Sequence, residues 1–382
     1  MALMLGSSSA PMAQDEPSGA LIETSALQAI IVDGETGAVL FEKDADQTFP
    51  PASLAKLMTM ELVFRALGDG TITPRTEYPV SEFAWRIGGA PSGTSTMFAE
   101  VRSNIPVDAL MQGVIVQAAN DAAIILAEGM EGTEAAFAEA MNARAAELGM
   151  ADSRFVNATG LPAEGQVVTV RDLARLARHI EATYPQQYRL YAQPEFEWNE
   201  ILQRNRNPLL RLDIGATGMA TGFTEASGYS LVGVTDQGGQ KLFIALGGLE
   251  SEAARAEESA RLLAWAGEAF DRRTLFSAGE TIGSALVYGG TRSEVPLVTD
   301  RDLAAHVPKE APESVKAVLV YDGPLRAPVA KGDRVGRIEV QLDGRTSISH
   351  ELFAADDVPQ GNFSSRAIGA VQELAFGWIR AL

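Results

Sequence analysis

The chain contains 382 residues, of which 31 are basic and 50 acidic, so its formal net charge is −19. An apolar fraction of 46% is typical of a globular protein and argues against disorder and collagen-like repeats. The acidic balance argues against a nucleic-acid binder, which needs a basic face for phosphates, and against a polybasic membrane-surface protein. The absence of cysteine removes disulfides, zinc–thiolate sites, iron–sulfur clusters and cysteine nucleophiles, and three widely separated histidines predict no metal site. At about 150 residues per domain, the length predicts two or three domains.

Residues 1–26 are expected to be an N-terminal tail that contains the remnant of a secretory signal. The run Ala10, Pro11, Met12 and Ala13 resembles the end of a signal peptide, with cleavage after Ala13. The positive region and the long apolar stretch of a complete signal are missing, so a flexible, uninformative N-terminus is the alternative. The small-residue pattern favours export.

The segment 27–272 is expected to fold as an α+β domain, with helices gathered against an antiparallel sheet. A β-hairpin is expected over residues 29–33 and 38–41. A helix is expected from Ser53 to about Leu67, and Thr169 is the expected N-cap of a helix over 169–180. Further helices are expected within 105–150 and 251–270, and strands near 230–234 and 241–246.

The segment 273–363 differs from the preceding one in its sequence pattern and is expected to be a small β-rich domain. Short β-type runs occur at 284–288, 315–321 and 335–342, and Gly-, Pro- and Asp-rich turns separate them. Residues 364–382 predict an amphipathic helix with its apolar side chains on one face. This helix either lies in a membrane interface, or docks on its own domain. No apolar stretch is long enough to span a membrane.

One short motif carries the chemistry: Ser53 is followed three positions later by Lys56, at the start of a predicted helix. Residues i and i+3 share a helix face, so the Lys56 amine is expected close to the Ser53 hydroxyl. A lysine partly stripped of solvent has a lowered pKa and can take the proton of a serine nucleophile. The helix N-terminus also offers backbone N–H groups to a developing oxyanion. The alternative interpretation is an exposed serine and lysine without a catalytic role.

Three motifs follow one another along the chain: S-x-x-K within Pro51–Thr59, Ala-Ala-Asn-Asp-Ala at 118–122, and Ala-Thr-Gly-Phe-Thr at 220–224. In this order and spacing the chain resembles the S11 family of D-alanyl-D-alanine carboxypeptidases, the low-molecular-weight penicillin-binding proteins. Segments that also fit the family are 92–98, 157–161 and 205–210. The resemblance extends from about residue 27 to 272, and it is looser for the β-rich segment and the tail.

The resemblance implies a penicillin-binding/β-lactamase-like transpeptidase domain followed by a small β-rich domain. It also implies a periplasmic serine peptidase that removes the terminal D-alanine from peptidoglycan stem pentapeptides, without a metal or organic cofactor. Ser53 would attack the carbonyl of the penultimate D-Ala, Lys56 would be the general base, and Asn120 would complete the catalytic group. Thr221 and Gly222 would bind the substrate. β-Lactams would acylate Ser53, and the C-terminal helix would attach the enzyme to the outer face of the inner membrane if it binds lipid.

Two positions depart from the family pattern: Ala118 replaces a serine and Ala220 replaces a lysine. In the family the serine helps pass a proton to the leaving amine, and the lysine supports the electrostatics of the site and the substrate's terminal carboxylate. Loss of a proton relay costs about 10²–10⁴ in rate, and loss of one oriented electrostatic group about 10²–10³, so an impaired rate is expected. Lys241 lies in the sequence where the family carries a carboxylate-binding arginine. It either replaces part of the missing charge or is a solvated edge-strand lysine.

Three alternative functions stay open at this point. The two alanines suggest a catalytically degenerate homologue that binds peptidoglycan or a cell-wall partner. A serine β-lactamase would need an efficient deacylation residue, and the sequence offers no residue for that role. The remaining alternative is an unrelated α+β domain with a chance Ser-x-x-Lys.

Overall fold

The computed structural model describes residues 22–237 and 239–362. The helices in this part of the chain are α1 (Lys56–Gly68), α2 (Glu82–Ile87), α3 (Val107–Gln117), α4 (Asn120–Glu131), α5 (Glu134–Glu147), α6 (Val170–Thr183), α7 (Pro185–Tyr188) and α8 (Glu252–Glu268). The strands are β1 (Gln28–Asp33), β2 (Val39–Lys43), β3 (Glu77–Pro79), β4 (Asn104–Pro106), β5 (Glu195–Trp198), β6 (Ile201–Arg204), β7 (Ala216–Thr224), β8 (Gly228–Gln237), β9 (Gln240–Leu249), β10 (Phe270–Phe276), β11 (Thr281–Tyr288), β12 (Glu294–Val298), β13 (Leu303–Pro308), β14 (Val315–Tyr321), β15 (Leu325–Arg326), β16 (Arg334–Leu342) and β17 (Arg345–Ala354). Most of the predicted N-terminal tail and the predicted helix over 364–382 lie outside the described residues.

The predicted elements are largely confirmed. The hairpin over 29–33 and 38–41 is the antiparallel pair β1 and β2. Thr169 caps α6, because its hydroxyl accepts a hydrogen bond from the amide of Asp172 at 3.1 Å. Strand β7 was not predicted, because its glycines and alanines have a low β-propensity.

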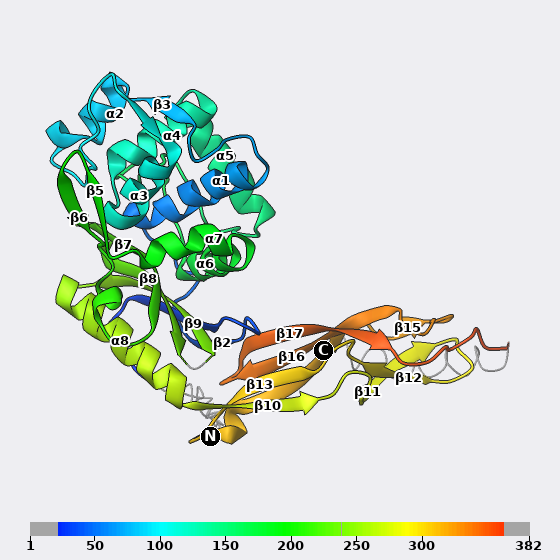
Figure 1. Ribbon diagram of the computed structural model, residues 1–382. Coiled ribbons are helices and arrows are strands. Elements are labelled where there is room, and N and C mark those ends of the chain that lie inside the picture. The colour runs from blue at the N-terminus through cyan, green and yellow to red at the C-terminus, as the bar shows by residue number, and fades with distance from the viewer. Residues whose placement is uncertain (1–21, 238, 363–382) are drawn as a thin grey trace, which may run out of the picture.

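The main sheet consists of β2, β1, β9, β8 and β7 in that order, all antiparallel. Side chains alternate between its two faces, as the pleat requires. On β9, Phe243 and Ala245 join the core under α6, whereas Leu242 and Ile244 join the core under α8. The helices therefore cover both faces, with α6 and α8 on opposite sides (Figure 1). This arrangement confirms the predicted α+β class.

Helix α1 is the centre of the helical part of the molecule. It contacts α3, α4, α5 and α6, and its residues from Lys56 to Phe64 are buried. A helix that is buried all round has no amphipathic stripe, and tertiary packing on several sides holds it in place. Lys56 therefore belongs to an element that packing holds on several sides.

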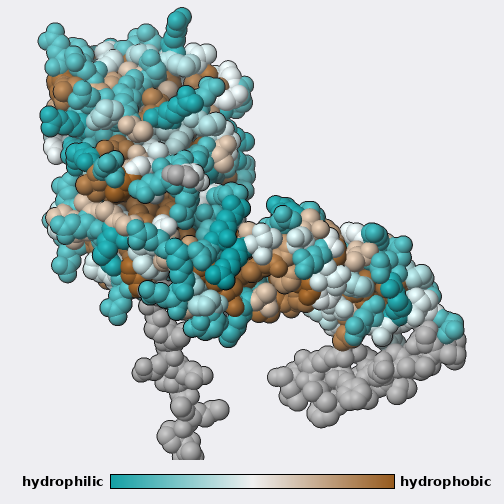
Figure 2. Space-filling model, turned by 60° about the horizontal axis from the view of Figure 1, so that its bottom comes forward, coloured by the Kyte–Doolittle hydropathy of each residue, from teal (hydrophilic) through white to brown (hydrophobic). Residues whose placement is uncertain are grey.

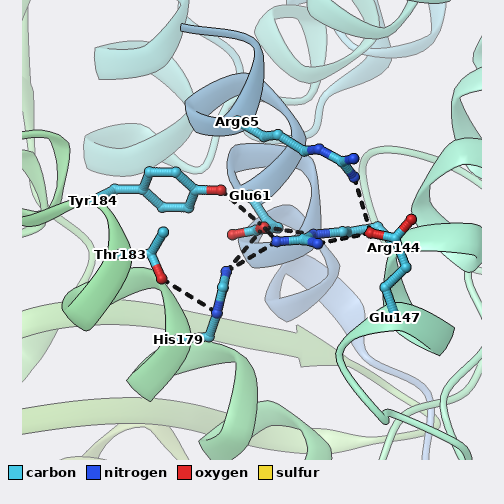
Figure 3. A network of polar contacts seen from close by, with 7 residues as sticks. All are labelled: Glu61, Arg65, Arg144, Glu147, His179, Thr183 and Tyr184. Atoms are coloured by element: carbon cyan, nitrogen blue, oxygen red, sulfur yellow. Dashed lines mark hydrogen bonds and ion pairs between the residues drawn. The ribbon is translucent and has the colours of Figure 1, made fainter. Parts of the chain in front are cut away.

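One buried acid ties α1 to its neighbours. Glu61, on α1, is 0% exposed, and its Oε1 atom lies 2.8 Å from Nη2 of Arg144 on α5. The same oxygen accepts a hydrogen bond from the hydroxyl of Tyr184 at 3.2 Å and lies 3.2 Å from Nε2 of His179. Figure 3 shows these groups converging on Glu61 from α5, from α6 and from the residue that follows α6. The Arg144 guanidinium is the cation that makes burial of this carboxylate tolerable.

Replacement of Arg144 by alanine is expected to lower the free energy of unfolding by about 3–5 kcal/mol, because it leaves a buried carboxylate without its cation. Urea unfolding followed by circular dichroism measures this loss. The matched control is Arg65→Ala: Arg65 is 48% exposed and pairs with Glu147 at 3.1 Å, so its loss should cost at most about 1 kcal/mol. Equal losses for the two variants would contradict the role assigned to Arg144.

The strands after α8 form a second part of the molecule, called here the β-arm (residues 270–362). β10 pairs with β13, and a larger sheet has the order β14, β16, β17, β12, β11 and β15. Figure 1 shows the β-arm extending sideways from beneath the main sheet, and Figure 2 shows apolar surface on the β-arm near the junction. Among the described helices, none has the length and apolarity needed to cross a membrane.

The β-arm is bonded to the edge strand of the main sheet. From β17, Ser347 Oγ donates a hydrogen bond to the Val39 carbonyl at 2.7 Å, and Arg345 Nη1 donates one to the Glu42 carbonyl at 2.7 Å. Both carbonyls belong to β2, so these bonds satisfy backbone groups on the outer edge of the sheet. The opposite edge strand is β7, which borders the site described next.

Candidate active site

Ser53 lies in a short 3₁₀ turn, Ala52–Ala55, that leads directly into α1. Amide N–H groups at the start of such a helix have no acceptor within it, so the N–H of Ser53 is available to a developing oxyanion. The turn lies against β7. A Cβ atom on Gly222 would meet the Pro51 carbonyl and the Ala52 side chain at 3.1 Å, so glycine allows β7 to lie close beside the nucleophile.

Lys56 is buried and makes three polar contacts with its amine. The Nζ atom lies 3.0 Å from Ser53 Oγ, 2.6 Å from Asn120 Oδ1 and 2.6 Å from the carbonyl oxygen of Thr159. The side chain is 3% exposed, and desolvation lowers the pKa of Lys56 to about 7, while the charges of Asp121 and Glu134 act in the opposite direction. Near neutral pH the amine is therefore neutral in about half of the molecules.

The geometry directs the lone pair of the neutral amine. The two contacts at 2.6 Å are to oxygens that can only accept, so they hold two amine hydrogens. The remaining position faces Ser53 Oγ. Neutral Lys56 can therefore take the hydroxyl proton of Ser53 without rearrangement.

Asn120 is positioned by the junction between α3 and α4. Its Nδ2 group donates to Thr94 Oγ1 at 2.9 Å, and its backbone N–H donates to the Ser95 carbonyl at 2.7 Å. The next residue, Asp121, is fully buried and accepts hydrogen bonds from the amides of Met97 and Ala99. Asp121 therefore fixes the loop that precedes the second motif, while Asn120 faces the amine of Lys56.

The loop 157–161 supplies the third partner of Lys56, which the sequence did not predict. Asn157 Oδ1 accepts hydrogen bonds from the amides of Thr159 and Gly160, which holds the loop in a tight turn. Gly160 has φ +80°, and a Cβ atom there would lie 1.7 Å from the Ala52 carbonyl. The only earlier signal was that this segment fits the family pattern, without a role for the carbonyl.

A narrow cavity adjoins the nucleophile. It is lined by Ser53, Lys56, Leu57, Met60, Val114, Ile115, Ala118, Tyr191, Asn205, Arg206, Asn207, Met219, Ala220 and Thr221. Thr221, predicted to bind substrate, is in this lining, and Gly222 follows it on β7. Both positions that depart from the family pattern, Ala118 and Ala220, also line the cavity. Ala118 has φ +56° at the end of α3.

The structure does not bring Lys241 to this site, contrary to expectation. Thr221 pairs with Leu231, and Leu231 pairs with Leu246. Lys241 comes five residues before Leu246 on β9, which is about 17 Å along the strand. Its amine forms an ion pair with Glu181 of α6.

Arg255 is a basic residue near β7 that its sequence context did not indicate. It lies on α8, is 5% exposed, and its Nη1 atom is 3.5 Å from the Gly222 carbonyl. Its guanidinium stacks 5.5 Å from the ring centroid of Tyr229, which in turn lies 4.3 Å from the ring of Phe223. The stack and the contact with the Gly222 carbonyl support the position of β7.

Two known protein families match this chain, one over each of its parts. The D-alanyl-D-alanine carboxypeptidase family matches residues 11–247, which is more than half of the chain. The chain belongs to this family of serine peptidases. The C-terminal domain of penicillin-binding protein 5 matches residues 270–360, which covers most of the β-arm.

Individual relatives agree with this assignment. The D-alanyl-D-alanine carboxypeptidase DacA of Escherichia coli (strain K12) is 32% identical over 352 residues, covering 91% of this chain and 87% of that protein. The crystal structure of penicillin binding protein 5 from Haemophilus influenzae has a TM-score of 0.73 and 33% identity, covering 90% of this chain and 100% of that one. Penicillin-Binding Protein D2 from Listeria monocytogenes, solved in its ampicillin-bound form, has a TM-score of 0.58 and 27% identity over 65% of this chain and 99% of that one.

The predicted family, transpeptidase fold and serine-type D-Ala-D-Ala carboxypeptidase activity are thereby confirmed. The alternative of a degenerate homologue that only binds peptidoglycan has no support from these relatives. Members of the family are cell-wall enzymes.

Proposed function

We propose that this enzyme releases the terminal D-alanine of peptidoglycan stem pentapeptides through an acyl-enzyme on Ser53. One observation carries the proposal: the buried amine of Lys56, with a pKa of about 7, lies 3.0 Å from the Ser53 hydroxyl. A base with a pKa near the working pH combines a useful fraction of neutral amine with a sufficient affinity for the proton.

Acylation follows from these contacts. Neutral Lys56 takes the proton from Ser53 Oγ as the oxygen forms a bond to the carbonyl carbon of the penultimate D-Ala. The carbonyl oxygen becomes an oxyanion, and the backbone N–H of Ser53 donates to it. The protonated amine of Lys56 then gives its proton to the leaving nitrogen. The C–N bond breaks, and D-alanine departs with a neutral amine.

Deacylation repeats the same steps with water. Lys56, neutral again, takes a proton from a water molecule as that oxygen attacks the ester carbonyl. The C–O bond to Ser53 breaks, and the serine oxygen recovers the proton from Lys56. Asn120 holds the amine through its Oδ1 in both steps.

The alanine at 118 reduces the rate in this proposal. Ala118 offers no hydroxyl to carry the proton to the leaving amine, so Lys56 delivers it directly. Loss of such a relay costs about 10²–10⁴ in rate. Ser53, Lys56 and Asn120 keep their mutual contacts, which supports a slow enzyme that still forms the acyl intermediate.

The proposal extends to the inhibitors of the enzyme, its location and its domain organisation. β-Lactams are expected to acylate Ser53, as the ampicillin-bound relative from Listeria monocytogenes suggests.

We place the enzyme in the periplasm, with attachment to the outer face of the inner membrane through residues 364–382. We also propose a peptidase domain and a β-rich domain, which the sequence placed at 27–272 and 273–363. That boundary falls inside β10, which pairs with β13 of the β-arm, so we place the division between the end of α8 at Glu268 and the start of β10 at Phe270.

Intact-mass spectrometry after incubation with penicillin tests the nucleophile. The expected result is one adduct per chain that is absent from Ser53→Ala, together with D-alanine release from a pentapeptide by the unmodified enzyme only. An adduct that persists in Ser53→Ala would assign the nucleophile to another residue. Absence of both adduct and D-alanine release from the folded, unmodified chain would overturn the proposed function.

A further inference from the structure

The loop 157–161, which contacts the amine of Lys56, is held from its other side by a carboxylate. Glu134 is the first residue of α5 and is half-buried. Its Oε1 atom accepts a hydrogen bond from the amide of Ala158 at 3.1 Å. The carbonyl of Ala158 accepts a hydrogen bond from the hydroxyl of Thr59 on α1 at 2.7 Å. The loop is therefore held between α5 and α1, one residue before the carbonyl that contacts Lys56.

Capping of α5 does not account for this contact. Thr133 is the N-cap, and its hydroxyl accepts a hydrogen bond from the amide of Ala136 at 3.1 Å. The helix dipole favours a negative charge in the first turn, which explains a glutamate at this position. The dipole alone does not require a contact with another segment, yet the Glu134 carboxylate bonds the amide of Ala158 across 24 positions of sequence. The contact therefore has a separate role.

Two acids act on the charge of Lys56. Desolvation lowers the pKa of Lys56 to about 7, and the negative charges of Asp121 and Glu134 limit that fall. The acids belong to α4 and α5, both of which contact α1. Burial raises the pKa of Glu134, the amide of Ala158 lowers it, and the charges of Glu128 and Lys56 act in opposite directions. The proton affinity of Lys56 therefore depends on a balance between burial and these two carboxylates.

The two acids differ in what else they hold. Asp121 is fully buried, and it fixes the loop before the second motif through two amides and the hydroxyl of Thr96. Its replacement would therefore release that loop as well as remove a charge. Glu134 accepts a hydrogen bond from one loop amide, and an uncharged amide oxygen can take over that bond. The charge of Glu134 can therefore be removed separately from its hydrogen bond.

We propose that Glu134 is a positioning residue for Lys56: it holds the loop that presents the Thr159 carbonyl, and its negative charge favours the protonated amine. The inference rests on the proposed function, because the proton affinity of Lys56 matters only if Lys56 is the base. The bond to Ala158 keeps the amine directed at Ser53. The charge of Glu134 sets the pH above which the amine can take the serine proton. One carboxylate thus links the geometry of the base to the pH range of the enzyme.

The rate of acylation by penicillin, measured as a function of pH, tests the role of the charge. Glu134→Gln keeps an oxygen that can accept the Ala158 amide but removes the negative charge. The pKa of Lys56 should then fall, so the midpoint of the acid limb should move down by about 0.3–1 pH unit. The rate at about pH 6, as a fraction of the plateau of the same variant, should therefore rise about 2–5-fold. A purely structural role would lower the rate without moving the midpoint.

Glu134→Ala removes the hydrogen-bond acceptor as well as the charge. The loop is then released and the Thr159 carbonyl no longer holds the amine of Lys56. The plateau rate should fall more than about tenfold, because misplacement of a catalytic group by about 1 Å costs at least that much. The midpoint should move down as it does in Glu134→Gln. Circular dichroism establishes that both variants are folded.

Glu139→Gln is the matched control, since Glu139 is an exposed residue of the same helix and its replacement makes the same change in net charge. It should keep the profile of the unmodified enzyme, and an equal shift there would assign the effect to the charge of the whole chain. An unchanged or raised midpoint in Glu134→Gln would overturn the role of the charge, although the proposed function stands. Equal plateaus for Glu134→Gln and Glu134→Ala would overturn the role in holding the loop. If the unmodified enzyme forms no penicillin adduct and releases no D-alanine, the proposed function fails, and this inference fails with it.

Discussion

Replacing Lys56 by methionine is expected to slow acylation of Ser53 by penicillin about 10³–10⁴-fold. Methionine fills a similar volume in the buried site but has no lone pair on nitrogen that can take the Ser53 proton. Stopped-flow or intact-mass measurement of the acylation rate gives the ratio directly. A loss below about tenfold would show that another group activates the serine.

The pH profile separates loss of the base from loss of packing. The burial-lowered pKa of Lys56, about 7, makes the protonated form dominant below pH 7 and inactive as a base. Acylation by the unmodified enzyme should therefore fall tenfold per pH unit below about 7 and level off above it. Lys56→Met should show no such midpoint.

Two further variants complete this test. Lys56→Arg keeps a positive charge but stays protonated at every accessible pH, so it should be as slow as Lys56→Met. Lys316→Met, on β14 of the β-arm, should acylate at the unmodified rate. An active Lys56→Arg would mean that the charge at this position matters and its proton transfer does not.

Replacing Gly160 by alanine is the second change with a large expected effect. The new Cβ atom would lie 1.7 Å from the Ala52 carbonyl, next to the nucleophile, so the loop or the turn must move. Movement of the loop removes the Thr159 carbonyl from Lys56 and releases the amine from its position. We expect acylation to fall at least about 10²-fold, since misplacement by about 1 Å has that effect.

Gly165 provides a matched control for Gly160. Both residues have φ +80°, but a Cβ atom on Gly165 meets nothing within 4 Å. Gly165→Ala therefore measures the conformational cost alone, about 1–2 kcal/mol of unfolding free energy. It should leave the acylation rate unchanged, and equal kinetic losses in both variants would refute the steric argument for Gly160.

The centre of the site could be predicted because its parts are local in sequence. Ser53 and Lys56 are three residues apart at the start of a helix, and that spacing alone brings the amine to the hydroxyl. Asn120 could be added only through the resemblance to a family, since 64 positions separate it from Lys56. Its contact with the amine depends on how α1 packs against the junction of α3 and α4.

The remaining parts depend on register and loop geometry, which the sequence does not reveal. Lys241 was expected at the site because it follows the third motif, yet the pairing of β8 with β9 carries it to the far end of the strand. The Thr159 carbonyl is a backbone group, which every residue type carries, so the sequence does not indicate its role. Arg206 belonged to a segment that fitted the family, but only the cavity lining indicates that it faces the same space as Ala220.

The hydrogen bonds from Ser347 and Arg345 to β2 have a consequence for the solubility of the whole chain. An edge strand with unpaired carbonyls is a template on which strands of other molecules can add, and sheets whose edges stay open tend to aggregate. In this molecule the β-arm covers part of the β2 edge, while β7, the other edge, contributes residues to the cavity lining. The β-arm therefore shields one edge of the main sheet from the addition of a strand of another molecule.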